Sequence, residues 1–283
     1  MSQKREQAIK KRRIFLITVS AVLIVVILLL AGAIKLIANS INKSNEKDVS
    51  EKEQISDTES AESEELKPQK KDVAFDDTPD MVTLGEYTLD ANFKKLLLVN
   101  ADHPLPEDYD YTGNLVKIEA KYHNGQLDML DKDIWPYMKA MIEKAWEDGV
   151  DLKVWSPYRA YNTQKMLFDN MTKKVKTADM TEQQAQDKAA TIVARPGTSE
   201  HHTGFATDFN MADDKFEQTP MFEWLQKNAQ DYGFILRYPK NSQDKTGVIY
   251  ESWHYRFVGI NVAKEIKSLG VTLEEYLEIK GIE

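Results

Sequence analysis

Two histidines and two carboxylates in the second half of the sequence have the types and order of a metal-dependent hydrolytic site. His201 precedes Asp208 in the stretch PGTSEHHTGFATD, and Glu251 and His254 follow in ESWHYRF. Two imidazoles and one carboxylate can fill three corners of a tetrahedral zinc site and leave the fourth open for water. Zinc lowers the pKa of such a water toward ~7. A second carboxylate can take its proton and later deliver one to a leaving amine.

Each of these residues also has a simpler interpretation. Asp208 lies in an otherwise apolar, alternating stretch, where an unpaired buried carboxylate is costly and needs a cation or hydrogen-bond donors. It could pair with an arginine instead of a metal. A histidine among aromatics is commonly a hydrogen-bonded core or surface residue, and Glu251 could end a strand in solvent. Residue types and spacing alone leave both interpretations open.

A resemblance to a known family favours the metal site. The segments PGTSEHHTGFATDF, YGFILRYP and ESWHYRFVG, in that order, closely resemble the D-alanyl-D-alanine carboxypeptidases of the VanY type. Related L,D-carboxypeptidases of the same zinc peptidase family share the pattern, and WSPYRAYNTQ is similar to the family's Ser-x-Tyr-Arg-Ser motif. The resemblance covers roughly Leu96 to Gly259. It implies that His201, Asp208 and His254 bind zinc and that Glu251 is the general base.

The resemblance also implies how the substrate is held. Arg159 is expected to bind the terminal carboxylate of the peptide, because a guanidinium can donate two parallel hydrogen bonds to a carboxylate. Gln164 and Ser199 match positions that look like polar groups of the substrate pocket. The implied reaction is release of the C-terminal D-Ala from peptidoglycan stem peptides.

The sequence departs from the family pattern at three positions. His202 follows His201 where the family often has Gln, and we expect it to point away from the metal because neighbouring side chains diverge. Ser252 replaces a common Pro, and Ala160 replaces a Ser. None of these departures removes a catalytic group.

Three further arginines could contact an anionic muropeptide. For two of them, which lie in strand-like aromatic segments, structural ion pairs are the better expectation. The three arginines are Arg195, Arg237 and Arg256, of which Arg237 and Arg256 lie in the strand-like segments.

The N-terminal part of the sequence predicts a membrane anchor. A basic stretch, residues 1–13, precedes the apolar run from Ile14 to Ile34, which as a helix is long enough to cross the ~30 Å bilayer core. We expect a single transmembrane helix over residues 14–38, with its basic end in the cytoplasm and the rest of the chain outside the cell. A cleaved signal peptide is the alternative, although its apolar core is normally only ~7–15 residues.

Two unlike segments follow the predicted anchor. Residues 39–80 are rich in Glu, Ser, Lys and Asp and have few large apolar groups, so we expect a disordered linker. Residues 81–283 contain all five tryptophans and are expected to fold as one domain.

Helical and strand-like patterns are mixed in this domain without regular β-α-β alternation, which predicts an α+β fold with a small, mostly antiparallel sheet flanked by helices. One helix is indicated by apolar residues at helical spacing, and another by a capping box of Thr181 and Gln184. Helices are expected over 134–149, 162–175, 181–193, 220–233 and 271–281. Strands are expected over 152–159, 202–210, 248–252 and 253–259.

Composition excludes several function classes. The net charge of −9 argues against nucleic acid as a partner, because phosphate binding needs a basic surface. The sequence has no cysteine, which rules out disulfides, thiolate metal sites and a cysteine nucleophile. Imidazole and carboxylate ligands suit other divalent metals as well as zinc. We expect a monomeric zinc carboxypeptidase with D,D or L,D specificity; a module that binds wall peptides without cutting them is the alternative.

Overall fold

The computed structural model describes residues 75, 77–106, 109 and 112–282. The predicted basic N-terminus and anchor, and most of the predicted linker, lie outside these residues. Within the described part of the chain, no helix is both long enough and apolar enough to cross a bilayer.

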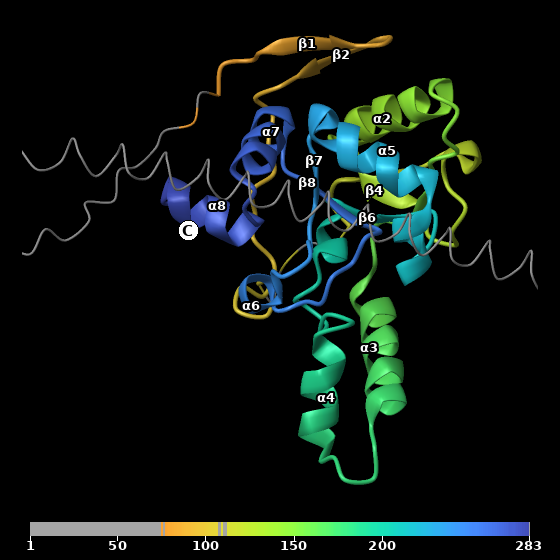
Figure 1. The fold of residues 1–283 in the computed structure, drawn as a ribbon, viewed down its shortest axis with the longest axis vertical. Coiled ribbons are helices and arrows are strands. Elements are labelled where there is room, and N and C mark those ends of the chain that lie inside the picture. The colour runs from red at the N-terminus through yellow and green to blue at the C-terminus, as the bar shows by residue number, and fades with distance from the viewer. Residues whose placement is uncertain (1–74, 76, 107–108, 110–111, 283) are drawn as a thin grey trace, which may run out of the picture. The chain divides into compact units, whose positions relative to one another are not determined.

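A four-stranded antiparallel sheet forms the centre of the domain (Figure 1). Its strand order is β5-β6-β8-β7, so the last strand in the chain is inserted between two earlier ones. Two separate hairpins, β1–β2 and β3–β4, precede it in sequence. The bounds are β1 Met81–Leu84, β2 Tyr87–Asp90, β3 Leu115–Lys117, β4 Met129–Asp131, β5 Val154–Ser156, β6 Ala206–Phe209, β7 Phe234–Leu236 and β8 His254–Phe257.

Helices surround this sheet, and several were expected from their sequence patterns. The apolar spacing after Ile134 gives a helix, α2, which buries one face against the sheet and ends before Gly149. The bounds are α2 Trp135–Glu147, α3 Tyr161–Val175, α4 Glu182–Ala190, α5 Pro220–Asn228, α6 Gln243–Thr246, α7 Ile260–Leu269 and α8 Leu273–Lys280.

The two faces of the sheet bury different sets of apolar residues. Successive side chains of a strand point to opposite faces, and the neighbours Phe234 and Ile235 of β7 belong to different clusters. The larger cluster, with Phe234 and Phe257, packs against α2 and α5. The smaller one, with Ile235, packs against α7 and α8. Asp208 and His254 fall on the Ile235 face, because Arg256, two residues after His254, pairs with Ile235.

Helices α3 and α4 form a hairpin that projects from the rest of the domain (Figure 1). The predicted capping box is present: Thr181 Oγ1 accepts the Gln184 N–H, and the Gln184 side chain accepts the Thr181 N–H. The hairpin begins at Tyr161, two residues after Arg159, so its base lies beside the predicted substrate clamp.

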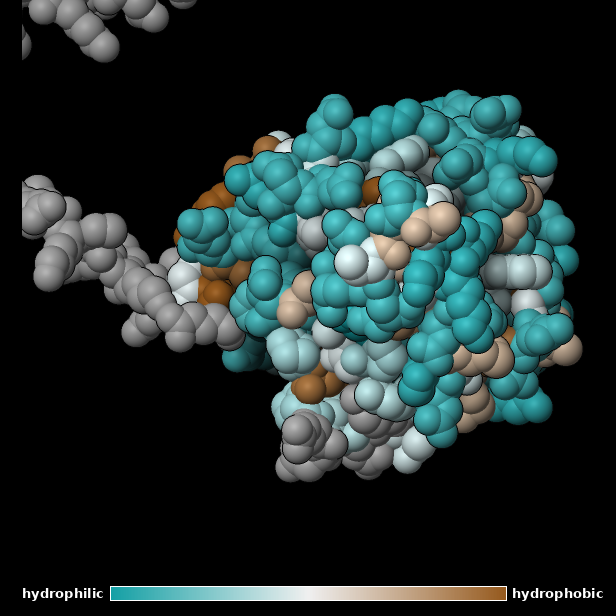
Figure 2. All heavy atoms as spheres, turned by 90° about the horizontal axis from the view of Figure 1, so that it is seen from below, coloured by the Kyte–Doolittle hydropathy of each residue, from teal (hydrophilic) through white to brown (hydrophobic). Residues whose placement is uncertain are grey.

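The surface is mostly hydrophilic on the face seen in Figure 2. Hydrophobic residues gather there toward the side that α7 and α8 occupy in Figure 1. Leu269 at the end of α7 and Ile279 of α8 are both more than half exposed.

The α+β class and the small antiparallel sheet are confirmed, and three details of the predicted elements are corrected. Residues 248–252, expected to form a strand, do not pair with the sheet: the Ile249 N–H donates to Thr191 and the Glu251 N–H to Tyr238. The expected strand 202–210 is a 3₁₀ turn, η2 (Glu200–Thr203), followed by β6. Helix α7 was not expected.

Candidate metal centre and active site

Strand pairing brings two of the predicted ligands together. In the register of β6 and β8, Asp208 lies directly opposite His254. Directly opposed residues of an antiparallel pair project from the same face with their Cβ atoms about 5 Å apart. Ser156 of β5 is the partner of Asp208 on the other side. Three neighbouring strands therefore contribute one polar residue each to the same row.

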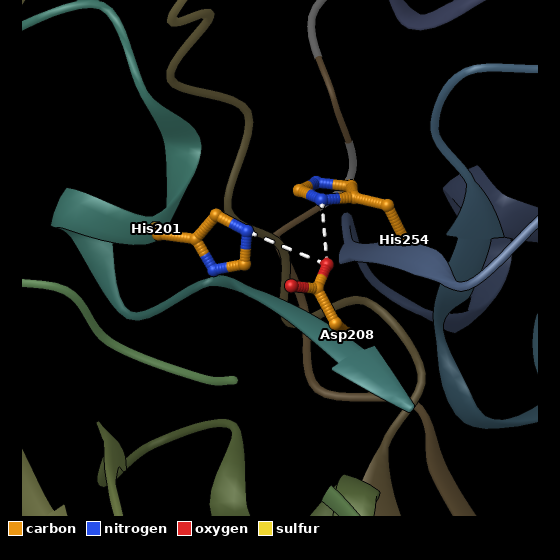
Figure 3. Close-up of side chains that lie close together, drawn as sticks. All are labelled: His201, Asp208 and His254. Atoms are coloured by element: carbon orange, nitrogen blue, oxygen red, sulfur yellow. Dashed lines mark hydrogen bonds and ion pairs between the residues drawn. The ribbon is translucent and has the colours of Figure 1, made fainter. Parts of the chain in front are cut away.

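The third predicted ligand comes from the turn before β6. His201 lies in η2, which ends at Gly204 with a left-handed φ of 71°. A Cβ on Gly204 would lie 2.8 Å from the backbone nitrogen of Asp131, so only glycine allows this close approach without displacement. The turn directs the His201 ring toward Asp208 (Figure 3).

The three side chains form a compact and buried group. One potential ligand atom from each lies within 4.8 Å of the others. Asp208 Oδ1 is 3.5 Å from His201 Nε2 and 3.2 Å from His254 Nδ1. Ligand atoms ~2.0–2.2 Å from a tetrahedral zinc ion lie roughly 3.3–3.5 Å apart. The donor set, and the two distances from Asp208 Oδ1, therefore fit a zinc ion.

Each imidazole faces an oxygen atom on the side away from Asp208. His201 Nδ1 lies 2.8 Å from the carbonyl oxygen of Pro157 and donates to it, which leaves Nε2 as the acceptor. His254 presents Nδ1 to Asp208, and its Nε2 lies 3.5 Å from Glu200 Oε2. Such outer partners fix the tautomer of a metal-binding histidine.

The charged neighbours control ionisation in this group. Burial alone would raise the pKa of Asp208, but His201, His254 and Arg159 outweigh it and hold that pKa well below its usual range. Burial, followed by the Arg159 charge, lowers the pKa of His201 to about 4. The Asp208 carboxylate is therefore ionised and the His201 ring is neutral, which are the states that bind a metal. Burial alone would lower the pKa of His254, but Asp208 and Glu200 outweigh it and raise that pKa to about 9, so a metal must displace a proton from this ring.

Glu251 lies beside the three potential ligands. Its Oε2 is 3.7 Å from His254 Nδ1, and its backbone N–H donates to the carbonyl of Tyr238. Burial raises the pKa of Glu251 to about 7, with His254 acting in the opposite direction. A carboxylate with a pKa near neutrality can both accept and return a proton.

Arg159 lies at the edge of the same group. Its Nε donates to Ser156 Oγ and its NH1 group donates to Gln164 Oε1. Its NH2 group donates to His201 Nε2 and to Asp208 Oδ2, each at 2.9 Å. The arginine–Asp208 pair that the sequence left open is therefore present, in addition to the approach of the two histidines.

Comparisons with known proteins identify the family of this chain. A sequence model of the family described as "VanY: D-alanyl-D-alanine carboxypeptidase" matches residues 127–260. One similar solved structure is a mutant of the vancomycin resistance D,D-pentapeptidase VanY from a VanB-type resistance cassette, in complex with Zn(II). Its sequence is 39% identical to this chain. The match covers 64% of this chain and 98% of that one, with a TM-score of 0.55. The chain belongs to the VanY family.

Two further relatives show the range of activities named in the family. A D-alanyl-D-alanine carboxypeptidase of Enterococcus faecalis is 40% identical over 64% of this chain and 65% of its own length. The chain thus matches just under two thirds of that relative. The structure of the LD-carboxypeptidase LdcB is 35% identical over 71% of this chain and 94% of that one, with a TM-score of 0.57.

Gln164 and Ser199, the two expected polar groups of the substrate pocket, are both buried. The Gln164 side chain is fully buried, with Oε1 accepting from Arg159 and Nε2 donating to the Ala194 carbonyl. Gln164 therefore contacts the Arg159 guanidinium directly, and its expected contact with substrate stays a prediction. Ser199 is buried at the start of η2, where its carbonyl accepts the His202 N–H. Its expected contact with substrate stays a prediction.

His202 does not compete with His201 for a metal. Its Nδ1 lies 2.7 Å from the Arg159 carbonyl oxygen, and its Nε2 accepts the Gly197 N–H at 3.1 Å. Its ring stacks on that of Tyr161. Both ring nitrogens thus have backbone partners at the base of the α3–α4 hairpin.

The three additional arginines form ion pairs within the domain. Arg195 pairs with Asp187 of α4. Arg237 and Arg256 are fully buried, as expected for structural ion pairs, and both contact Glu200. Burial alone would raise the pKa of Glu200, but these arginines outweigh it and hold that pKa below its usual range.

Sequence reasoning missed Glu200. The only signal in the sequence was a carboxylate directly before His201. The structure shows that this segment, η2 and β6, is buried throughout.

Proposed function

We propose that this protein is a zinc-dependent carboxypeptidase that removes the C-terminal D-Ala from peptidoglycan stem peptides. The observation that carries the proposal is the convergence of His201, Asp208 and His254 within 4.8 Å, beside a buried Glu251. The names of the VanY-family relatives support the substrate class, and the Zn(II) complex of one relative supports the metal.

In the proposed mechanism, Glu251 transfers the proton. His201 would hold zinc through Nε2, His254 through Nδ1 and Asp208 through a carboxylate oxygen. Zinc bound there supplies a Lewis acid that makes water a nucleophile at neutral pH. Glu251 takes a proton from the attacking water and returns one to the departing D-Ala nitrogen. This reaction needs no covalent intermediate with the protein.

Arg159 is proposed to recognise the free end of the peptide. A carboxypeptidase cuts one residue from the chain end, so the group that binds the terminal carboxylate must lie close to the hydrolytic centre. The Arg159 NH2 group lies 2.9 Å from His201 Nε2 and 2.9 Å from Asp208 Oδ2. When His201 Nε2 holds a metal, this NH2 group becomes available to the substrate carboxylate, while Ser156 and Gln164 keep the guanidinium in place.

The decisive experiment measures D-Ala release. The full-length protein is purified, loaded with zinc and incubated with pentapeptide and tetrapeptide muropeptides, and products are followed by mass spectrometry. We expect release that a chelator abolishes and zinc restores. Release from the pentapeptide indicates D,D specificity, and release from the tetrapeptide indicates L,D specificity. Zinc binding without release from either peptide would contradict the enzyme assignment and favour the peptide-binding module.

We also propose that the protein is anchored in the cell membrane with its catalytic domain outside. The basic residues before the apolar run from Ile14 to Ile34 support this orientation. Because the sequence has no cysteine, single cysteines can report topology. In intact cells, a membrane-impermeant maleimide should label Ser60→Cys and not Ser2→Cys. The reverse pattern, or label on neither variant, would contradict the proposal. The expected monomeric state stays a prediction, to be tested by light scattering.

A further inference from the structure

Glu200 is a buried carboxylate whose two oxygens have different surroundings. Its side chain is fully buried, and Oε1 accepts from Arg237 Nε and from Arg256 NH1, both at 2.8 Å. Both arginines therefore use the same oxygen. Oε2 is left on the side that faces the metal centre.

The second oxygen faces a metal-binding histidine. Glu200 Oε2 and His254 Nε2 are 3.5 Å apart. Both atoms are buried, and neither has a hydrogen-bond partner among the described residues. A buried polar atom without a partner is costly, and the most direct way to satisfy both atoms is for Nε2–H to donate to Oε2. A closer approach of a few tenths of an ångström makes that hydrogen bond.

We propose that Glu200 is a positioning residue for the metal centre, which accepts the Nε2–H of His254 and so turns the Nδ1 lone pair toward the metal. The inference rests on the proposed zinc site. Without a fixed proton on Nε2, the ring could carry its proton on Nδ1, and the atom that faces Asp208 could not bind a metal.

The arginine pair explains why Glu200 acts as a partner of His254 and not as a fourth ligand. Two guanidinium groups hold Oε1, which fixes the carboxylate behind the ring. Arg237 also donates to Glu274 of α8 through NH1 and NH2. Arg256 is fixed independently by the carbonyl oxygens of Lys95 and Leu97. Loss of Glu274 therefore leaves Glu200 held by Arg256.

Zinc affinity tests this role without measuring catalysis. We compare the full-length parent, Glu200→Gln and the control Glu274→Gln in competition with a chromogenic chelator. Loss of a carboxylate partner behind a metal-binding histidine weakens metal binding by roughly 10–100-fold. We expect that loss for Glu200→Gln, and a change of less than about threefold for Glu274→Gln, which removes a charge from the same network but not from His254.

The outcomes separate the inference from the proposed function. Parent-like affinity in Glu200→Gln would overturn the positioning role and leave the zinc site standing. Equal losses in both variants would also overturn it, since the effect would then come from the arginine network in general. A parent protein that binds no zinc would overturn the zinc site and the inference together.

A second measurement does not depend on the variant folding. In the zinc-loaded parent labelled with ¹⁵N-histidine, we expect His254 to carry its proton on Nε2 and His201 to carry its proton on Nδ1. The two metal-binding rings thus should show opposite tautomers. A proton on Nδ1 of His254 would overturn the inference even if Glu200→Gln fails to fold.

Discussion

Burial changes the pKa of Glu251 in the direction that its proposed role in proton transfer requires. A solvated glutamate has a pKa near 4.3 and is too weak a base at neutral pH. Burial raises the pKa of Glu251 to about 7, although the nearby His254 opposes the shift. A base and acid with that pKa works best near neutral pH.

Replacing Glu251 by Gln should separate catalysis from metal binding. The amide has nearly the same size but cannot take a proton, so we expect kcat for D-Ala release to fall by roughly 10²–10⁴-fold. Zinc affinity should change little, because the three proposed ligands are unchanged. The control is Glu223→Gln, which alters an exposed carboxylate on α5. A Glu251→Gln protein as active as the parent would contradict the base assignment.

Arg159 should account for the preference for a free chain end. In Arg159→Lys, kcat/KM for a peptide with a free terminal carboxylate should fall by roughly 10–100-fold, because charge-assisted hydrogen bonds from the guanidinium are lost. The same peptide with a terminal amide should lose much less. Arg195→Lys, at an arginine paired with Asp187, is the matched control. Equal losses on both peptides would show that Arg159 does not recognise the carboxylate.

The sequence indicated the proposed metal ligands better than the residues behind them. His201, Asp208 and His254 carry distinctive chemistry within recognisable motifs, and the structure brings them together. Gln164 and Glu200 also lie in those motifs, but their contacts depend on where Arg159 and His254 are placed by tertiary packing. The order of residues in the sequence does not reveal the distances from Gln164 to Arg159 or from Glu200 to His254.

Among the elements, the turn from η2 to β6 determines where His201 points. Gly204 ends η2 in the left-handed region and lies against the backbone of Asp131 in β4. The turn thus depends on contact with a strand of a different sheet.

Gly204→Ala should therefore destabilise the domain more than a comparable glycine replacement. We expect the free energy of unfolding to fall by about 2–3 kcal/mol, from the unfavourable φ and the backbone clash together. Gly149→Ala is the control, since Gly149 also has a positive φ, of 81°, but no atom lies within 4 Å of the added Cβ. Its free energy of unfolding should fall by about 1 kcal/mol. Urea unfolding of the metal-free proteins measures both. Equal losses of unfolding free energy in the two variants would show that the close approach of residue 204 to the Asp131 backbone does not affect stability.

Element prediction succeeded where local signals were strong. The capping box of Thr181 and Gln184 and the apolar spacing after Ile134 are local, and both helices are present. Residues 248–252 have strand-like composition, but their backbone groups bond to Thr191 and Tyr238, which are distant in sequence. Tertiary hydrogen bonds override local propensity there.

At the scale of the whole molecule, a bound metal would link the η2 turn, β6 and β8. A ligand that binds only the folded state stabilises it by mass action, by about 4 kcal/mol at a free concentration 1,000 times its Kd. We expect zinc to raise the melting temperature of the parent in a concentration-dependent way. The shift should disappear in His254→Ala. A parent whose melting temperature ignores zinc would contradict a site shared by these segments.

The position of β8 also has a consequence for the order of assembly. β8 is the last strand in the sequence, yet it lies between β6 and β7. During synthesis, the chain exposes His201 and Asp208 well before His254 exists, and β6 and β7 have no direct pairing with each other. The sheet therefore cannot close until β8 has been made, and the proposed metal site can be completed only after most of the polypeptide has been synthesised.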